Sequence, residues 1–173
     1  MANTYQDAKL NALAGFLPAE VSADVKAMQA AFEANRHRIY SLAFWMTDNE
    51  LNAEELMAAT FGRAFAASDS PSADAIDAAL LSEIRKEVVV GPLTLNCGTC
   101  SEVKNVRENT LRVHLERAVV QIPITERLIF LLHDVESYEH ARIAKLIGIS
   151  ENESIQGLHQ AHLKMRELLA KMN

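Results

Sequence analysis

Apolar residues recur at helical spacing along almost the whole chain, and this period limits the folds that the chain can adopt. Met57, Phe61 and Phe65, for example, follow one another at intervals of four residues. Side chains at this spacing lie on one face of an α-helix. The longest stretch with strand character is the short run 88–90. The sequence therefore predicts an all-α fold.

Breaks in the helical period divide the chain into parts. Gly91 and Pro92 stop the first series of apolar stripes, and a clear period returns only at Leu111. Because glycine and proline interrupt helices, we interpret the intervening stretch as a linker between two small helical domains. The predicted parts are an N-terminal extension at 1–29, a first domain at 30–90, a linker at 91–107 and a second domain at 108–173.

The N-terminal extension is mildly amphipathic. It carries Leu10, Leu13, Phe16 and Leu17 at helical spacing. We expect this segment to pack across the two domains or to mediate self-association.

Individual residues predict where helices begin and end. Asn52, with Glu55 three residues later, has the pattern of a capping box that opens a helix. Thr125 is expected to cap the helix that follows Pro123. Gly148 is expected to end another helix, because glycine adopts the left-handed conformation found at helix C-termini.

Composition excludes several classes of protein. The 173 residues are 49% hydrophobic, which is too apolar for a disordered chain, and glycine and cysteine are too rare for a collagen-like or disulfide-rich fold. The longest uncharged stretch, 88–101, is too short and too broken to span a membrane, and the N-terminus lacks the pattern of a signal peptide. We expect a cytoplasmic protein.

The charge pattern argues mildly against a nucleic-acid partner. Lys and Arg number 17 and Asp and Glu number 23, which gives a net charge of −6. No basic stripe of the kind that grips phosphates occurs, and the small cluster 36–38 (Arg-His-Arg) is expected on a solvated helix face. The motifs of nucleotide-binding enzymes, zinc proteases and serine hydrolases are also missing from the sequence, so no catalytic residue is predicted.

Cys97 and Cys100 form a single CxxC pair within the predicted linker. Two thiols at this spacing can supply half of a zinc site or a redox pair, and His114 could add a third zinc ligand. A second cysteine pair and a thioredoxin-like βαβ pattern are both missing from the sequence. Free thiols are therefore the favoured interpretation, and no metal or cofactor is predicted.

Residues 141–158 have the layout of a helix-turn-helix motif. Ala144 is a small residue in the first helix, Gly148 stands in the tight turn, and Ile149 follows before a second helix that starts with polar residues. In that geometry the N-terminal half of the second helix enters a DNA major groove. A plain helical hairpin needs the same apolar spacing, so the spacing alone leaves both interpretations open.

The residues around this motif resemble a known family. The segment 115–123 (LERAVVQIP), then Glu126-Arg127, 130–136 (FLLHDVE), Ile143-Ala144 and 148–151 (GISE) resemble the fourth region of bacterial sigma factors, above all the small extracytoplasmic-function group. Tyr40, Leu42-Ala43, 53–56 (AEEL), Thr60-Phe61 and 63–65 (RAF) resemble the second region of the same family. The two resemblances occur in the family's order and cover most of residues 30–170.

The resemblance implies two helical domains that bind rather than catalyse. In the family, the second region docks on the clamp helices of RNA polymerase and melts the minus-10 promoter element, while the fourth region reads the minus-35 element and touches the polymerase flap. The implied partners are core RNA polymerase, promoter DNA and an anti-sigma protein. The implied polymerase contacts are Glu54, Glu55, Met57, Ala58 and Phe61, and the implied DNA contacts are Ile155, Gln156, His159 and Gln160.

Both implied surfaces depart from the family pattern. Ala58-Ala59 stands where members usually have Gln-Glu, and the implied DNA contacts include no permanent cation. Gln156 and Gln160 could still read adenine edges. Glu151 and Glu153 would repel phosphates, although they suit the dipole at the start of a helix.

Two functions follow from these observations. The first is a sigma factor that directs RNA polymerase to promoters, and the double resemblance favours it. The second is a sigma-like interaction protein that binds a protein partner or a second copy of itself without promoter recognition, and the acidity and the lost basic positions favour it. A neutral or acidic face around Gln156 that is buried against another chain would support the second.

Overall fold

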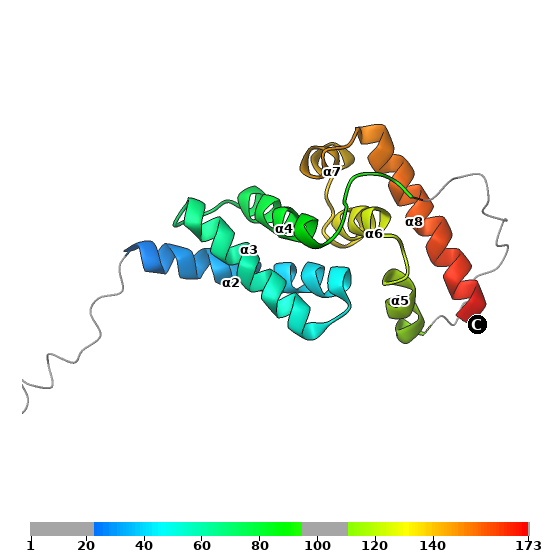
Figure 1. The fold of residues 1–173 in the computed structure, drawn as a ribbon, viewed down its shortest axis with the longest axis horizontal. Coiled ribbons are helices and arrows are strands. Elements are labelled where there is room, and N and C mark those ends of the chain that lie inside the picture. The colour runs from blue at the N-terminus through cyan, green and yellow to red at the C-terminus, as the bar shows by residue number, and fades with distance from the viewer. Residues whose placement is uncertain (1–22, 95–110, 173) are drawn as a thin grey trace, which may run out of the picture.

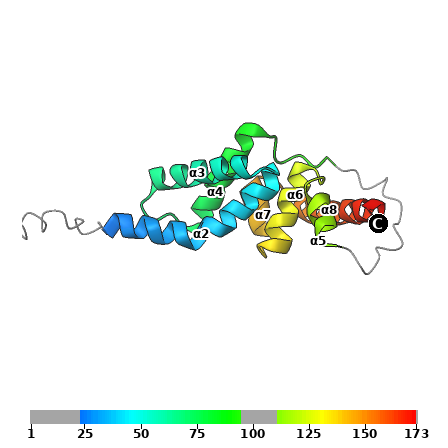
Figure 2. The same ribbon diagram turned by 90° about the horizontal axis from the view of Figure 1, so that it is seen from below.

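The computed structural model describes residues 23–94 and 111–172. Every regular element within these residues is helical, which confirms the predicted all-α fold. The elements are α2 (Ala23–Thr47), α3 (Glu50–Ala67), α4 (Ala73–Glu87), α5 (Arg112–Val119), α6 (Ile124–Phe130), the π-helical turn η1 (Leu131–Val135), α7 (His140–Ile147) and α8 (Glu151–Met172). Figures 1 and 2 show α2 to α4 on one side of the molecule and α5 to α8 on the other.

The first half is a three-helix unit in which α3 packs against both α2 and α4. Helix α2 begins at Ala23 and runs through the boundary predicted at residue 30. Alanine at positions 23, 27, 30 and 31 favours helix across that boundary. Leu10 to Leu17 of the predicted extension lie outside the described residues.

The start of α3 corrects the predicted cap. Asn49, not Asn52, is the N-cap, and its side-chain oxygen accepts a hydrogen bond from the backbone N–H of Asn52 at 3.0 Å. The chain reverses direction at Asp48, where φ is +52°, so Asn49 is the first residue able to cap. Both asparagines fit a capping pattern, and the position of the turn selects between them.

The second half is built around α8, which contacts α5, α6 and α7. Helix α6 begins at Ile124 directly after Pro123, so Thr125 is inside the helix and is not its cap. Thr125 is instead buried, and its hydroxyl oxygen accepts a hydrogen bond from the backbone N–H of Gly91 at 3.2 Å. The segment that leaves α4 is thereby fixed against α6.

A glycine in α8 allows this segment to pass close to the helix. A Cβ atom at Gly157 would lie 2.5 Å from Ile129 Cδ1 and 2.9 Å from Leu93 Cδ2. Next to Leu93, the backbone N–H of Thr94 donates to the fully buried Glu126 carboxylate at 2.6 Å. Residues 91–94 therefore lie across α6 and α8, and the close approach requires glycine at position 157.

Two glycines within helices provide a matched test of this packing. Gly62 in α3 has open space around its Cβ position, so Gly62→Ala should raise the free energy of unfolding by about 1 kcal/mol through helix propensity. Gly157→Ala should raise the free energy of unfolding by less than Gly62→Ala does, or should lower it, because the side chains of Ile129 and Leu93 must move. Urea unfolding of the two variants measures the difference, and an equal gain would show that the contact at Gly157 is not tight.

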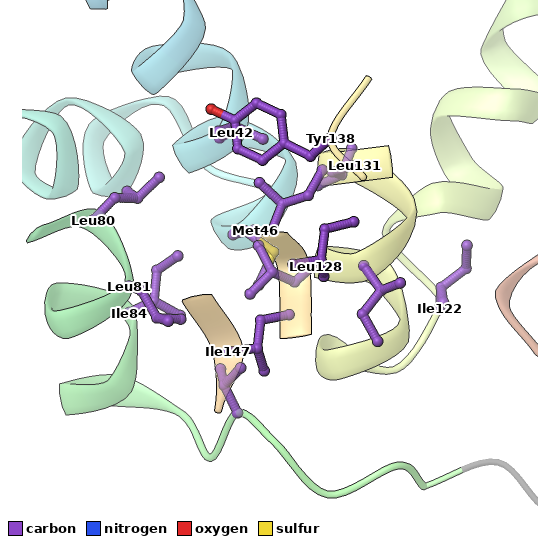
Figure 3. Packing of buried hydrophobic residues seen from close by; sticks show 14 of the residues in the cluster. Leu42, Met46, Leu80, Leu81, Ile84, Ile122, Leu128, Leu131, Tyr138 and Ile147 are labelled. Atoms are coloured by element: carbon purple, nitrogen blue, oxygen red, sulfur yellow. The ribbon is translucent and has the colours of Figure 1, made fainter. Parts of the chain in front are cut away.

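The two halves share one apolar core. Leu42 and Met46 of α2, together with Leu81 and Ile84 of α4, face Leu128 of α6 (Figure 3). A small pocket of about 10 Å³, with room for about one water molecule, lies where residues of the two halves meet. We call the residues that line this pocket the interdomain core: Leu42, Asp77, Leu80, Leu81, Ile84, Leu128, Leu132 and Leu146.

A buried carboxylate joins three helical segments beside this core. Asp77 of α4 is 3% exposed and accepts hydrogen bonds from Arg38 of α2 at 2.5 Å, Tyr138 at 2.6 Å and Arg142 of α7 at 3.2 Å. Arg142 also pairs with Asp74 at 2.6 Å and lies over the Tyr138 ring, 3.6 Å from its centroid. We call these residues the Asp77 network. Arg38 was expected on a solvated face, but the buried carboxylate holds it against α4.

The tyrosine in the Asp77 network is expected to lose its proton only at high pH. Burial and the hydrogen bond to Asp77 raise the pKa of Tyr138 to about 12. The raised pKa contributes stability that is complete below the unfolded value of about 10 and is lost as the pH rises through about 12. Ultraviolet absorbance of tyrosinate should show one tyrosine titrating near pH 12. This late step should be missing in Tyr138→Phe, and a late step that persists would assign it to another tyrosine.

Arginine side chains also cross between the halves. The buried Arg127 of α6 donates to the backbone carbonyls of Trp45 at 3.1 Å and Met46 at 3.3 Å, at the C-terminal end of α2. Its other N–H groups bond the carbonyls of Val120 and Ile122 in the turn before α6. The Arg127 side chain thus donates hydrogen bonds to backbone carbonyls at the end of a helix in one half and in a turn of the other half.

Candidate DNA-binding and polymerase-binding surfaces

Helices α7 and α8 form the predicted helix-turn-helix. Gly148 ends α7 in the left-handed conformation, with φ of +81° and ψ of 38°, as the sequence predicts. Ile143, Ala144 and Ile147 are buried, and Ile147 is followed by a short turn to α8. The turn therefore holds the start of α8 at a fixed angle to α7.

The start of α8 has a capping box that the sequence analysis did not identify. The Glu153 carboxylate accepts hydrogen bonds from the backbone N–H and the hydroxyl of Ser150, both at 2.7 Å. In return, the backbone N–H of Glu153 donates to the Ser150 hydroxyl oxygen at 3.2 Å. These hydrogen bonds lower the pKa of Glu153. The Ser-x-x-Glu spacing is the sequence signal for this cap, and Glu153 therefore has a structural role.

The exposed face of α8 contains three of the four predicted DNA contacts. Ile155 is 46% exposed, and Gln156 and His159 are also exposed. Gln160 is only 8% exposed, so this conformation does not offer it to a DNA base. It lies three residues after the buried Gly157 and next to the buried Ala161, on the side of α8 that faces the protein. We name Ile155, Gln156 and His159, with the exposed Asn152 one turn earlier, the α8 face.

Three histidines connect the segment before α7, the start of α7 and helix α8. His162 Nε2 and His133 Nδ1 lie 2.6 Å and 2.8 Å from the two oxygens of Asp134. Partial burial raises the pKa of Asp134, but the hydrogen bonds with His162 and His133 outweigh it and lower the pKa. His140 stacks on His133 with ring centroids 4.5 Å apart, and its Nδ1 lies 3.0 Å from Ser154 Oγ in α8. These contacts fix the angle of α8.

Helix α3 presents most of the predicted polymerase contacts. Glu54, Glu55 and Ala58 are exposed, and Met57 is half-buried. Leu51 is 70% exposed one turn before them, although the sequence analysis did not select it. Its position three and four residues before the two glutamates is the signal that could have identified it. We name Leu51, Glu54, Glu55 and Ala58 the α3 face.

Phe61 is not part of the α3 face. Its side chain is 4% exposed and meets Phe32 of α2 edge-on, with ring centroids 4.8 Å apart. It also stacks on Phe65, with centroids 5.8 Å apart. The prediction that Phe61 contacts polymerase is therefore wrong for this conformation, because the residue lies on the side of α3 that packs on α2.

A groove runs beside the α3 face. Its volume is about 490 Å³, and α3 contributes Glu55, Leu56 and Ala59 to its lining. Glu83 of α4 also lines the groove and forms ion pairs with Arg63 at 2.5 Å and with Lys86. Hydrogen bonds from Lys86 and Arg63 keep the pKa of Glu83 below its usual value. The lining of the groove thus combines apolar side chains with carboxylates.

Cys97 and Cys100 lie outside the described residues, so their interpretation stays a prediction. Within residues 23–94 and 111–172, no three histidine, cysteine, aspartate or glutamate side chains are arranged to hold a metal ion. Over the same ranges, no helix combines the length and the apolar character that a membrane crossing requires.

Comparison with known proteins finds a family similarity in the second half. Residues 112–165 match the family model described as "Sigma-70, region 4", which spans α5 to most of α8 and includes the helix-turn-helix. No curated protein matches the chain. Residues 112–165 are therefore similar to region 4 of the sigma-70 family, and this similarity supports a sigma factor.

Proposed function

We propose that the chain directs bacterial RNA polymerase to promoters as a sigma factor of the extracytoplasmic-function type. In this proposal the α3 face binds core polymerase and the α8 face binds promoter DNA. One observation carries the proposal. The region 4 match falls on a helix-turn-helix whose second helix has Ile155, Gln156 and His159 exposed in its first half. This is the part of a helix-turn-helix that contacts base edges.

The α8 face has side chains that can read bases. The amides of Gln156 and Asn152 can form paired hydrogen bonds with adenine, and Ile155 can contact a thymine methyl group. Each paired contact of this kind contributes about 1–3 kcal/mol of discrimination. The proposal therefore predicts a promoter element rich in A·T pairs.

The same face has little attraction for phosphates. Glu151 and Glu153 are exposed at the start of α8, and the α8 face has no lysine or arginine. Since phosphate neutralisation provides most of the non-specific affinity of DNA-binding proteins, the free chain should bind DNA weakly. Polymerase must then provide the remaining affinity, and recognition should depend on the complete complex.

The α3 face suits a partner surface that is basic and partly apolar. Glu54 and Glu55 provide two exposed carboxylates, and Leu51 provides an exposed apolar side chain. Burial of such an exposed apolar side chain against a partner would contribute favourable free energy to binding. The proposal assigns this surface to core polymerase.

Run-off transcription tests the proposal. Core RNA polymerase, the full chain and a library of genomic fragments should yield transcripts that are missing without the chain. The variant Gln156→Ala/His159→Ala should lower transcript yield about fivefold or more, because it removes one paired base contact. Polymerase binding should remain unchanged. The control Gln29→Ala changes an exposed glutamine of α2 and should have no effect.

A second candidate function is supported by the charge of α8. A sigma-like regulator that binds polymerase or another protein without reading DNA would need no cations on this face. Polymerase binding without any dependent transcript would favour this second function. Failure to bind polymerase at all would contradict the first proposal.

A further inference from the structure

We propose that DNA binding by the α8 face is coupled to proton uptake, with His159 and His162 as the groups that gain charge and contact DNA phosphates. The inference rests on the proposed function for the identity of its ligand, duplex DNA. It adds a form of regulation to that same surface, because a fall in pH would strengthen binding without changing which bases are read.

His159 and His162 continue the exposed side of α8 toward the C-terminal end of the helix. His159 is exposed and follows Ile155 by four residues. The side chain of His162 is 41% exposed, and this residue follows Ile155 by seven. Residues four and seven positions apart lie on the same side of an α-helix. At about 1.5 Å per residue, the two histidines are therefore about 6 and about 10 Å further along the helix than Ile155.

These distances place the histidines at the edge of a DNA groove. The first half of the second helix in a helix-turn-helix enters the major groove, which is about 12 Å wide. When Ile155 and Gln156 contact base edges, side chains about 6–10 Å further along the helix reach the phosphates that border the groove. A protonated imidazole offers two N–H donors and a positive charge to phosphate oxygens, whereas the neutral ring offers one N–H and no charge.

Asp134 of η1 sets the charge around His162. Its two carboxylate oxygens lie 2.6 Å from His162 Nε2 and 2.8 Å from His133 Nδ1. Partial burial raises the pKa of Asp134, but the hydrogen bonds with His162 and His133 outweigh it and lower the pKa. The carboxylate therefore stays charged near neutral pH and repels phosphates while both imidazoles are neutral. Each proton that an imidazole takes up offsets this charge. His140 stacks on His133 with ring centroids 4.5 Å apart, so a charge on both of these rings is unfavourable.

The other charged groups around α8 do not respond in the same pH range. Glu151 and Glu153 lie at the start of the helix, and Arg166 is exposed one turn beyond His162. The helices that contact α8 carry further ionisable side chains: Arg112, His114, Glu116 and Arg117 of α5, Glu126 and Arg127 of α6, and His140, Arg142 and Lys145 of α7. Histidine is the side-chain type that ordinarily changes charge between pH 5 and 8, so the histidines carry the response.

Titration of DNA at two pH values tests the proton uptake. A fluorescently labelled duplex rich in A·T pairs is titrated with the full chain at about pH 7.5 and at about pH 6, at one ionic strength. A proton bound together with DNA changes the dissociation constant by up to about tenfold per pH unit, so binding should tighten about fivefold or more at the lower pH. The log–log dependence of affinity on salt should also steepen by about one to two, since each phosphate contact adds about 0.9 to the slope.

Variants of the two histidines assign the effect. His159→Gln/His162→Gln should lose most of the pH dependence, because glutamine gains no charge. His159→Gln alone changes only an exposed side chain and should lose part of it. His159→Arg/His162→Arg should bind DNA at about pH 7.5 at least as tightly as the unaltered chain does at about pH 6. The matched control is His37→Gln, which changes an exposed histidine of α2 and should keep the full pH dependence. Circular dichroism at both pH values checks that each variant retains its helix content.

The outcomes separate this inference from the proposed function. Equal affinities of the unaltered chain at both pH values would overturn the proton coupling, as would a pH dependence that persists in the double glutamine variant or a lack of DNA binding at both pH values. Run-off transcripts that depend on the chain, together with DNA binding that is independent of pH, would contradict this inference alone. DNA binding that depends on pH and on the histidines, without any such transcript, would contradict the proposed function alone.

Discussion

Replacing Arg127 by methionine is expected to lower the free energy of unfolding by about 3–5 kcal/mol. Methionine fills much of the same space but donates no hydrogen bond. The carbonyls of Trp45, Met46, Val120 and Ile122 would lose the Arg127 donor, and an unsatisfied buried acceptor costs about 1–3 kcal/mol. Arg127 is 8% exposed, and this burial lowers the pKa of its guanidinium.

Urea unfolding followed by circular dichroism measures this effect. Arg117→Met is the matched control, because Arg117 is exposed on α5 and the change should stay within about 0.5 kcal/mol. Arg127→Lys should also be destabilised, since a single ammonium group cannot reach all four carbonyls. A loss below about 1 kcal/mol for Arg127→Met would mean that water replaces the guanidinium and that the crossing contact is weak.

Replacing Leu51 by aspartate is expected to weaken binding to core polymerase by at least about tenfold. Leu51 is 70% exposed in the free chain, so its apolar area is available to a partner. Burying a leucine side chain contributes about 1.5–3 kcal/mol, which corresponds to about 10–150-fold in affinity. Aspartate would also bring a third carboxylate to the α3 face, next to Glu54 and Glu55.

The control for this prediction is Val25→Asp. Val25 is 50% exposed on α2, so the chemical change and the starting exposure are similar, but the residue lies outside the α3 face. Titration of labelled chain with core polymerase gives both dissociation constants. Equal dissociation constants for Leu51→Asp and Val25→Asp would show that the α3 face does not take part in binding core polymerase.

The sequence allowed prediction of features that depend on neighbouring residues. The helical period identified the helices, and Gly148 marked the end of α7 because its left-handed conformation is a local property. The same logic failed at α3 and α6. At α3 both Asn49 and Asn52 fit a capping pattern, and the reversal at Asp48 selected Asn49. At α6 the helix begins directly after Pro123 without a side-chain cap, so Thr125 lies inside it.

Contacts between distant residues could not be predicted in this way. Asp77 and Tyr138 are 61 positions apart, and Arg38 and Tyr138 are 100 apart. Nothing local distinguishes Arg38 from the neighbouring Arg36, yet Arg38 joins the Asp77 network while Arg36 pairs with Glu33 on the helix surface. Helical spacing places a charged residue on a face, but the partner that covers that face comes from elsewhere in the chain.

The candidate sites show the same division. The family resemblance selected residues of α3 and α8 as contacts, and the exposed faces of these helices contain most of the selected residues. Phe61 and Gln160 are the exceptions, because each lies where its helix turns from solvent toward the protein. Exposure at such an edge depends on the packing partner, and the sequence period alone cannot resolve a rotation of less than one residue.

Photocrosslinking from position 156 tests most directly whether the α8 face reads DNA. A photoreactive benzoylphenylalanine in place of Gln156 is introduced into the full chain, which is combined with core polymerase and a promoter fragment found by run-off transcription. We predict a crosslink to DNA at the minus-35 element, with none from the same probe in place of Gln29 on α2. A crosslink from position 156 to protein alone would contradict promoter reading by α8 and would support the sigma-like regulator.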